Sequence, residues 1–569
     1  MPTLYAKIAG GNWSAAGTWS TTGSGGADNS GPPTSANDVI FELGSGNVTV
    51  DVGTQRSAKS LSCIAGTGDY IGILTHNANT LVVSGNITFS SGMTYTAVSS
   101  SAIIQVNGTG TITTNGKLIG QLQISGVTAT LGDNLTFIDS KTCSLLLGTS
   151  ASLNLNGKTV SGNSSINRVL LNSSIIGTAK TITVASGTFA NADFRDITFS
   201  SASNLDLSAI TGLSGNCGGN SITGGGTVLT FTTAVDQHWI AATGGDWSDV
   251  TKWTSRVPLP QDNVYFDNAF SASQTVTADM PRIGKSIDWT GATGTPTLAL
   301  TSTGNTRYGS LTLISGMTLT VTQTQTFEGR GSFTLTSAGK SFGAVTVAMF
   351  GGTLTLQDAY TGTGTLTLNN GTFIDNGFSV SITIFSSSNS NVRTITKTGT
   401  WTLTSTGTIW TTATATNLTL SDTGTISITD TSATSKTFAG GGKTYNNISI
   451  TGGGSGAVIF TGANTFNKIT VAGGTKTITL PGSTTTTLVS GDGLGNGTNV
   501  ITFNASAGSA TLSKTSGVLS WDYVSLTNIP STGGATFYAG TNSTDGGGNT
   551  GWNFTNAPPS GLLTTKVGS

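Results

Sequence analysis

Residues 345–373 read VTVAMFGGTLTLQDAYTGTGTLTLNNGTF, and this stretch decides the fold class. It contains the apolar-Thr-apolar triplets Val345-Thr346-Val347, Leu354-Thr355-Leu356 and Leu366-Thr367-Leu368. Each triplet has the period-2 pattern of a strand with one buried face and an outward threonine. The segments FGG, TGTG and NNG between them are typical of tight turns. The stretch therefore predicts short strands joined by glycine-rich turns.

The same pattern recurs along most of the chain. In the second half it returns at Ile382, Leu418, Ile426, Ile448, Ile469 and Ile478, and in the first half at 81–83, 111–113 and 182–184. Many short strands with tight turns predict an all-β fold, a right-handed parallel β-helix (β-solenoid). Coils of roughly 20–25 residues would give about six coils in the first half and about ten in the second. The alternative is a string of β-sandwich domains, which usually have longer strands and more inward aromatic residues than the 7% found here.

Composition supports the β assignment. Only 9% of the residues are charged, against roughly 25% in a typical domain. Glycine accounts for 80 of the 569 residues, and the two glutamates are Glu42 and Glu328. Helical proteins rely on Glu, Lys, Ala and Leu, whereas Thr, Val and Ile favour strands. The length exceeds one ordinary core, so we expect more than one unit.

A repeat at the start of each half defines two tandem units. GGNWSAAGTW at 10–19 matches GGDWSDVTKW at 244–253, and PTSANDVIF at 33–41 matches PLPQDNVYF at 258–266. Further on, Val50 is matched with Val276, and Lys59 with Lys285. Insertions confined to turns are what a shared fold tolerates.

The ends of the two halves also match, more weakly. Residues 193–198 (DFRDIT) resemble 520–525 (SWDYVS), and Gly218-Gly219-Asn220 resembles Gly547-Gly548-Asn549. We therefore predict a first β-helical unit at 1–234, a longer second unit at 235–555, and a flexible tail at 556–569.

Tryptophan is concentrated in these opening and closing elements. The residues predicted to form structural caps are Trp13, Trp19, Trp239, Trp247, Trp253, Trp521 and Trp552, with Trp289 also in the second opening. An uncapped solenoid exposes its core and its strand edges, and each large aromatic side chain buries about 150–250 Å². The competing interpretation is a tryptophan-lined platform on which sugars stack.

The sequence contains few groups for catalysis. His76 and His238 are the two histidines, they lie in different units, and a surface position is expected for both. Cys63, Cys143 and Cys217 are widely spaced, which predicts neither a disulfide framework nor a zinc site. We predict no catalytic, cofactor-binding or metal-binding residue, and no enzymatic activity.

Acidic groups are sparse as well. Asp246, Asp249, Asp262 and Asp267 in the second opening could hold calcium through oxygen ligands, but loop polarity is the favoured interpretation. Asp193 and Asp196 flank Arg195, which predicts a local ion pair.

Three further patterns are interpreted structurally. GDGLGNG at 491–497 lacks the Lys and the helix of a phosphate loop, so it predicts a turn. NSTDGGGN at 542–549 is an Asx/Gly turn cluster with at most weak ion binding. Ranks of outward threonine resemble an ice-binding surface, but they also follow from the strand propensity of threonine.

Charge and hydropathy limit the partners and the compartment. The net charge of −1 gives no basic field for nucleic acid or anionic lipid. The start MPTLYAKIAGGNW has no apolar run of signal-peptide length, and runs such as SLLLG at 144–148 fall short of the ~20 residues of a membrane span. We expect a protein without a signal peptide or membrane insertion, assembled in a cytoplasm.

Several segments together resemble one family of proteins. These are MPTLYAKIAGGNWSAAGTWS at 1–20, PPTSANDVIF at 32–41, GTLTLNNGTF at 364–373 and YAGTNSTDGGGNTGWNF at 538–554. They resemble the Gly/Thr-rich β-helical structural proteins of tailed bacteriophages.

The resemblance implies a virion protein of the tail fibre or spike type, commonly a homotrimer. Its partners would be other virion proteins and a host cell-surface glycan or protein. The alternatives are a capsid decoration or head-fibre protein, a bacterial surface adhesin, and a glycan-depolymerising tailspike.

Overall fold

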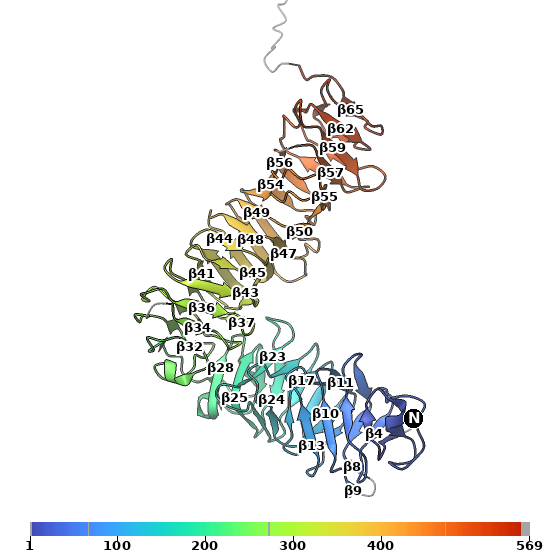
Figure 1. Ribbon diagram of the computed structural model, residues 1–569, viewed down its shortest axis with the longest axis vertical. Helices are drawn as coiled ribbons and strands as arrows, with labels where there is room; N and C mark the ends of the chain where they lie inside the picture. The colour runs from blue at the N-terminus through green and yellow to red at the C-terminus, as the bar shows by residue number, and fades with distance from the viewer. Residues whose placement is uncertain (1–2, 66–67, 271–272, 473, 559–569) are drawn as a thin grey trace, which may run out of the picture. The chain divides into compact units, whose positions relative to one another are not determined.

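The computed structural model describes residues 3–65, 68–270, 273–472 and 474–558 (Figure 1). This part of the chain is all-β, with 2% helix, and winds into a parallel β-solenoid of about 23 turns. Its helical segments are three 3-10 turns, η1 (Ala16–Thr18), η2 (Leu207–Ala209) and η3 (Val250–Lys252). The predicted all-β parallel β-helix is confirmed, whereas its right-handedness stays a prediction.

The chain divides into two compact units. Unit 1 comprises Met1–His238, Trp247–Val264 and Met280–Lys285, and unit 2 comprises Trp239–Asp246, Tyr265–Asp279 and Ser286–Ser569. The opening segment of the second repeat is therefore divided, with Trp247–Val264 assigned to unit 1 and Trp239–Asp246 to unit 2. The boundaries predicted at 234/235 and 555/556 stay predictions, and residues 559–569 of the predicted tail lie outside the described residues.

Unit 1 is built from three faces of stacked parallel strands. The first sheet has the order β29 (Ser221–Thr223), β26 (Ile197–Ser200), β24 (Lys180–Thr183), β21 (Ser152–Asn154), β18 (Thr128–Leu131), β15 (Gly110–Thr113), β12 (Ile87–Thr88), β7 (Ser60–Ser62), β4 (Asp38–Ile40), β1 (Leu4–Ala6), β3 (Trp19–Ser20). The second has the order β16 (Leu118–Ile119), β19 (Leu135–Phe137), β22 (Thr159–Ser161), β25 (Thr188–Arg195), β23 (Val169–Ser173), β20 (Ser144–Leu147), β17 (Gln121–Ile124), β14 (Ile103–Val106), β11 (Thr80–Val83), β6 (Arg56–Ala58), with β28 (Thr211–Asn216) on β25. The third has the order β13 (Thr94–Ala97), β10 (Ile73–His76), β5 (Val48–Val50), β2 (Gly11–Asn12), and the remaining pairs are β27 (Leu205–Asp206) with β30 (Leu229–Thr230) and β8 (Ile64–Ala65) with β9 (Gly68–Asp69).

The second set of sheets repeats this plan. Its longest sheet has the order β31 (Gln237–His238), β33 (Val264–Tyr265), β35 (Ile287–Asp288), β37 (Asn305–Arg307), β38 (Leu311–Thr312), β40 (Gln325–Phe327), β41 (Ser332–Thr336), β43 (Val345–Leu356), β45 (Thr365–Ile374), β47 (Ile384–Ser386), β48 (Arg393–Lys397), β50 (Gly407–Thr411), β51 (Leu418–Asp422), β53 (Lys436–Ala439), β55 (Val458–Thr461), β57 (Lys476–Leu480), β59 (Ile501–Ala505), β62 (Val524–Thr527), β65 (Thr544–Asp545). The others have the orders β32 (Gly245–Asp246), β34 (Thr275–Thr277), β36 (Thr297–Leu300), β39 (Thr318–Val321); β42 (Ser341–Phe342), β44 (Tyr360–Gly362), β46 (Val380–Ile382), β49 (Trp401–Leu403), β52 (Thr425–Ile428), β54 (Thr444–Ile450), β56 (Thr465–Val471), β58 (Thr485–Leu488), β60 (Thr511–Ser513), β63 (Ser531–Thr532); and β61 (Val518–Ser520), β64 (Thr536–Tyr538), β66 (Trp552–Asn553).

The ladders from turn to turn are parallel, and this excludes the alternative fold. For example, Ile104 pairs with Leu122, and Leu122 pairs with Leu145 on the next turn. Antiparallel pairs join β1 with β3 and β8 with β9, within the described residues. The string of β-sandwiches is wrong, because sandwiches consist of antiparallel sheets.

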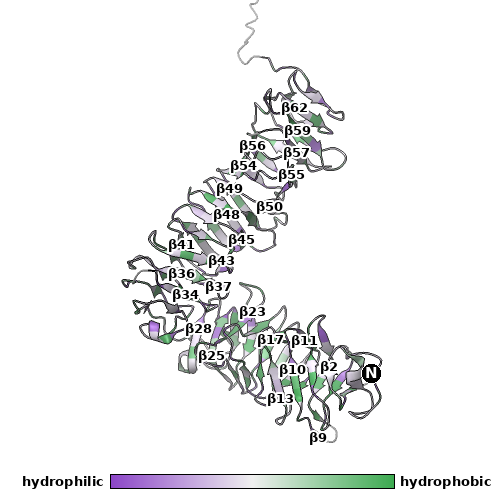
Figure 2. Cartoon of the chain, in the orientation of Figure 1, coloured by the Kyte–Doolittle hydropathy of each residue, from purple (hydrophilic) through white to green (hydrophobic). Residues whose placement is uncertain are grey.

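Alternation along each strand places apolar side chains in one column and hydroxyl side chains in another. The partners Ile104, Leu122 and Leu145 are all buried in the core of unit 1. In unit 2, Thr346 pairs with Thr367 on the opposite, outward face of the ladder. Figure 2 shows hydrophobic residues, in green, concentrated on the strands. The period-2 triplets therefore gave the correct face for both residue types.

The predicted number of coils is too low. About 23 turns are present, whereas spacing predicted about six and about ten. The opening and closing elements account for the difference, since they are turns of the solenoid themselves: β1 pairs in parallel with β4, and β62 with β65.

One matched position is also wrong. Gly11 pairs with Val48, and its counterpart Gly245 pairs with Val276, so Val276 corresponds to Val48 instead of Val50. The two registers differ because the following turn is two residues longer in the first repeat, which an alignment of short apolar runs does not detect.

Candidate functional site

The tryptophans of the two openings form the same local structure twice. The ring centroids of Trp13 and Trp19 lie 4.9 Å apart, and those of Trp247 and Trp253 also lie 4.9 Å apart. The indole nitrogen of Trp19 donates to the carbonyl of Trp13 at 2.9 Å, and that of Trp253 donates to the carbonyl of Trp247 at 2.7 Å. Each pair follows a strand, β2 or β32, that ends its sheet. This placement supports the predicted caps.

The other predicted cap residues are also packed against aromatic side chains. Trp239 stacks on Phe266 with centroids 5.8 Å apart, while Trp521 lies 5.2 Å from Trp552. All seven predicted cap residues are buried, and the most exposed of them, Trp552, is only 9% exposed. Their ring faces are therefore occupied by protein and leave no sugar platform.

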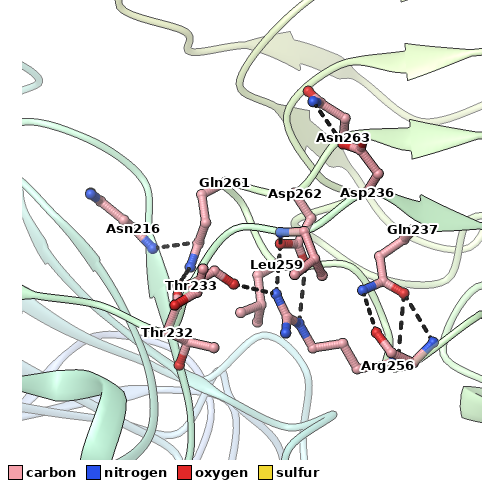
Figure 3. Close-up of polar contacts among 12 residues, drawn as sticks. Asn216, Thr232, Thr233, Asp236, Gln237, Arg256, Leu259, Gln261, Asp262 and Asn263 are labelled. Atoms are coloured by element: carbon pink, nitrogen blue, oxygen red, sulfur yellow. Dashed lines mark hydrogen bonds and ion pairs between the residues drawn. The ribbon is translucent and has the colours of Figure 1, made fainter.

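A polar network holds the segment after Trp253 in place (Figure 3). The Arg256 guanidinium binds both carboxylate oxygens of Asp262, at 2.7 and 3.1 Å, and donates to the carbonyl of Thr233 at 2.9 Å. Asp262 also accepts from the backbone N–H groups of Val235 and Leu259, at 2.9 and 2.8 Å. Asp262 is fully buried, so these donors replace the water that its charge has lost.

Next to this network, a side-chain amide closes the edge of β28. The Gln261 carbonyl oxygen accepts from the N–H of Asn216 at 2.8 Å. Its amide nitrogen donates to the carbonyls of Ser214 and Thr232, at 3.1 and 2.8 Å. Figure 3 shows Gln261 reaching the strand from the loop that carries Asp262. The amide thus provides the hydrogen bonds that a further strand would provide.

A buried carboxylate lies beneath the same edge. Asp193 binds the guanidinium of Arg168 at 2.7 Å through one oxygen and that of Arg282 through the other. Burial raises the pKa of Asp193, but the two guanidiniums outweigh burial and hold this pKa below its ordinary value. The predicted local ion pair is therefore wrong for Asp193, whereas a local pair of Arg195 with Asp196 stays a prediction. Arg168 and Arg282 lie far away in sequence, and the sequence contains no signal that joins them to Asp193.

The expectation of a surface position is wrong for His76. Its side chain is fully buried, with Nδ1 2.7 Å from the Tyr95 hydroxyl and Nε2 3.0 Å from the carbonyl of Asn79. Burial lowers the pKa of His76 to about 4. His238 is half-buried. His76 pairs with Ala97 on β13, so its inward position follows from the strand register.

Two of the four aspartates of the second opening take separate structural roles. Asp249 accepts from the N–H of Thr251 at 3.0 Å and caps η3, while Asp262 binds Arg256. Across the described ranges, no group of three or more His, Cys, Asp or Glu side chains is placed to hold a metal ion. The favoured loop interpretation is consistent with these contacts.

Buried ionic groups in unit 2 were not predicted. Asp375 accepts from the indole nitrogen of Trp401 and the N–H of Gly399, both at 2.9 Å. Lys397 binds Asp422 at 3.0 Å with both side chains fully buried. In each case the two partners lie on successive turns. The contact compensates a charge that is buried inside the solenoid.

One cavity has the dimensions of a ligand site. It measures about 600 Å³ and is lined by residues 492–495, Val518, residues 520–522 and residues 556–558. The GDGLGNG motif therefore lies along its wall, and the indole nitrogen of Trp521 donates to the carbonyl of Gly491 at 2.7 Å. The two motifs that were interpreted as turns, at 491–497 and 542–549, both contact residues that line this cavity.

The polar groups of this cavity are carboxylates and amides. Asp522 accepts from the backbone and side-chain nitrogens of Asn542, at 3.1 and 2.9 Å, and Asp492 accepts from the N–H of Ser520 at 2.8 Å. No Lys or Arg is among the described residues that line it. Such a wall suits a neutral or amine-bearing polar ligand better than an anion.

The three cysteines are free and buried. Burial raises the pKa of Cys143 to about 11, so its thiol is protonated and unreactive at neutral pH.

No family model, curated protein or solved structure matches the chain. Among the described residues, no helix is both long enough and apolar enough to cross a membrane. The class that the fold and the sites define is a parallel β-solenoid with aromatic opening and closing turns.

Proposed function

We propose that this chain is a structural protein of a bacteriophage virion, an appendage of the tail fibre or spike type that contacts the host surface. The observation that supports it is that three ionisable groups singled out in the sequence are used in packing contacts. Asp193, Asp262 and His76 are all buried and hydrogen-bonded. Stacked parallel ladders make a stiff body, which suits an appendage.

The host contact proposed is a neutral or amine-bearing glycan in the cavity beside Trp521. Asp492 and Asp522 provide acceptors for hydroxyl or ammonium groups, and Leu494 and Val518 provide apolar surface. The resemblance noted in the sequence favours a homotrimer together with other virion proteins. A virion protein of this kind would be assembled inside the host cell.

Location tests the proposal directly. Antibody raised against the recombinant chain should label virions at the tail in immunogold microscopy of purified particles and cell envelopes. Labelling on the head would indicate a decoration or head-fibre protein. Labelling confined to cell surfaces would contradict the virion assignment and favour an adhesin.

The glycan contact requires a separate test. Val518→Trp should fill the cavity and reduce binding of the protein to host cells at least tenfold. Val500→Trp is the matched control, because Val500 is similarly exposed and does not line the cavity. Equal binding by both variants would exclude this cavity as the contact site.

A further inference from the structure

The closing turns of the two repeats are built by the same set of hydrogen bonds. Asn220 donates to the carbonyl of Phe194 at 2.9 Å and accepts from the N–H of Ile197 at 3.0 Å. Asn549 donates to the carbonyl of Leu526 at 2.7 Å and accepts from the N–H of Ile529 at 2.9 Å. Residues 193–197 therefore correspond to 525–529. The match of this segment with 520–525 that the sequence predicted is wrong, because the counterpart of residue 193 is residue 525 and not residue 520.

The correspondence extends to the edge strands. Gly215 pairs with Asp193 on β28 and β25, and Thr544 pairs with Ser525 on β65 and β62. In unit 1, Gly215 is buried, because the loop carrying Pro260 and Gln261 lies against this edge. In unit 2, Thr544 and its neighbours up to Gly548 are exposed.

The two edges differ at the residue that admits the loop. A Cβ atom on Gly215 would lie 2.8 Å from Cδ of Pro260, and it would lie closer still, at 2.0 Å, to the Asp193 carboxylate of its own closing turn, where unit 2 has Ser525. Thr544 carries a branched side chain at the corresponding position. The edge of unit 2 has the same backbone hydrogen-bonding pattern as that of unit 1, but it cannot accept the same loop.

The two opening loops differ in a complementary way. Both form the same turn: the N–H of Thr34 bonds the Asn37 side chain at 2.9 Å, and the N–H of Leu259 bonds the Asp262 side chain at 2.8 Å. Between these positions the second opening has Leu259, Pro260 and Gln261. The first opening has Thr34, Ser35 and Ala36 instead, and Thr34 and Ser35 are exposed.

The arginine that follows also changes partner. Arg282 binds the buried Asp193 of the closing turn. Its counterpart Arg56 binds Asp51 on its own turn, at 2.6 Å. Arg56 therefore has its counter-charge on its own turn and does not need a carboxylate from a closing turn.

We propose that the first opening and the second closing turn are blocked forms of the contact inside unit 1, and that they prevent two copies of this chain from joining end to end. The occupant that they exclude is a second copy, because both halves of the contact are present in one sequence. Thr544 excludes the loop by steric conflict, and Ser35 and Ala36 remove the ring and the amide that would close the edge. A strand edge without a partner would otherwise form hydrogen bonds with a strand of another chain.

The test restores the loop and the edge that accepts it in two separate full-length chains. One carries Thr34→Leu, Ser35→Pro and Ala36→Gln, and the other carries Thr544→Gly. Each alone should keep the mass of the unchanged protein in light scattering after size-exclusion chromatography. An equimolar mixture should form a complex with twice that mass. A chain that carries all four changes should form larger assemblies as its concentration rises.

Two results would overturn the proposal, provided that circular dichroism shows folded chains. One is end-to-end growth of the unchanged protein, and the other is a mixture that keeps the mass of its components. A converse variant does not depend on assembly: Pro260→Ser with Gln261→Ala should speed hydrogen exchange of Ser214–Asn216 at least tenfold in the unchanged background. Unaltered exchange there would equally refute the argument that this loop closes the edge.

Discussion

At the scale of single residues, His76 connects burial to pH dependence. The carbonyl of Asn79 can only accept, so Nε2 carries the proton and Nδ1 accepts from the Tyr95 hydroxyl. Because burial lowers the pKa from 6.5 to about 4, the folded state resists protonation that the unfolded chain accepts. The contribution of neutral His76 to the free energy of unfolding is therefore fully present above pH 6.5 and is lost as the pH falls toward 4. The full loss is about 3 kcal/mol.

Urea unfolding between pH 4 and pH 7 measures this loss. His76→Gln should flatten the profile over that range, because the amide keeps polar contacts without a titrating group. Aspartates with lowered pKa, such as Asp51, lose their contribution only below their unfolded pKa near 3.8, so they do not mask the histidine. A flat profile in the unchanged protein would contradict the prediction.

Asp193 provides the second prediction at this scale. Asp193→Asn leaves the buried guanidiniums of Arg168 and Arg282 without a counter-charge, and should cost about 3–5 kcal/mol of unfolding free energy. Asp28→Asn breaks the exposed pair with Lys7 and should cost at most about 1 kcal/mol. Chemical denaturation compares the two variants. Similar losses would mean that Asp193 is not the neutralising group.

The residues that sequence reasoning placed wrongly share one property. His76 and Asp193 are polar, and polar residues are assigned to surfaces by default. Their positions depend on which strand lies on the next turn, and turn lengths vary along the chain. Apolar triplets need no such information, since their alternation alone predicts the buried face.

At the scale of elements, the opening is stabilised by its tryptophan pair. Trp13→Ala should remove a fully buried indole and the contact with Trp19, at a cost of about 3–5 kcal/mol. The loss should be local, with faster hydrogen exchange in β1 and β4 and little change in β17. Trp13→Phe is the milder control. Uniform exchange changes across unit 1 would contradict a cap that protects one end.

The closing turns make a paired prediction. Asn220→Ala and Asn549→Ala should each cost about 1–3 kcal/mol, because each leaves a backbone N–H without a partner and removes one of the two donors to a carbonyl. Asn→Asp at either position should be no better, since a carboxylate cannot donate to the carbonyl. Thermal unfolding of all four variants tests this. A loss at only one of the two sites would show that the turns are not equivalent.

The repeated elements could be recognised in the sequence, but their exact alignment could not. The tryptophan motifs at 10–19 and 244–253 are long and specific, and the same contacts between tryptophans are present in both. The closing motif is short, and both Tyr523 and Asn528 adopt the left-handed conformation that Asp196 has. Two positions therefore fit the same local signal, and the contacts of Asn549 and the backbone hydrogen bond from Asn528 to Gly547 distinguish them.

At the scale of the whole molecule, stability comes from stacked apolar columns and few charges. Only 9% of the residues are charged, and the pairs Arg168–Asp193 and Lys397–Asp422 are shielded from solvent. The number of turns was underestimated in the sequence for a related reason. Opening and closing segments have tryptophan and polar loops in place of triplets, although their backbones continue the same ladders.

This charge distribution predicts weak dependence on salt. Raising NaCl from about 0.1 to 1 M shortens the screening length from about 10 to 3 Å, which weakens exposed pairs and hardly affects buried ones. The exposed pairs, such as Lys59–Asp38, contribute at most about 1 kcal/mol each. The melting temperature should therefore change by less than about 4 °C. Sodium sulfate should raise it, because excluded salts strengthen apolar burial. Scanning calorimetry in the two salts is the measurement. A large fall in NaCl would show that charges at the surface, and not the apolar columns, hold the solenoid together.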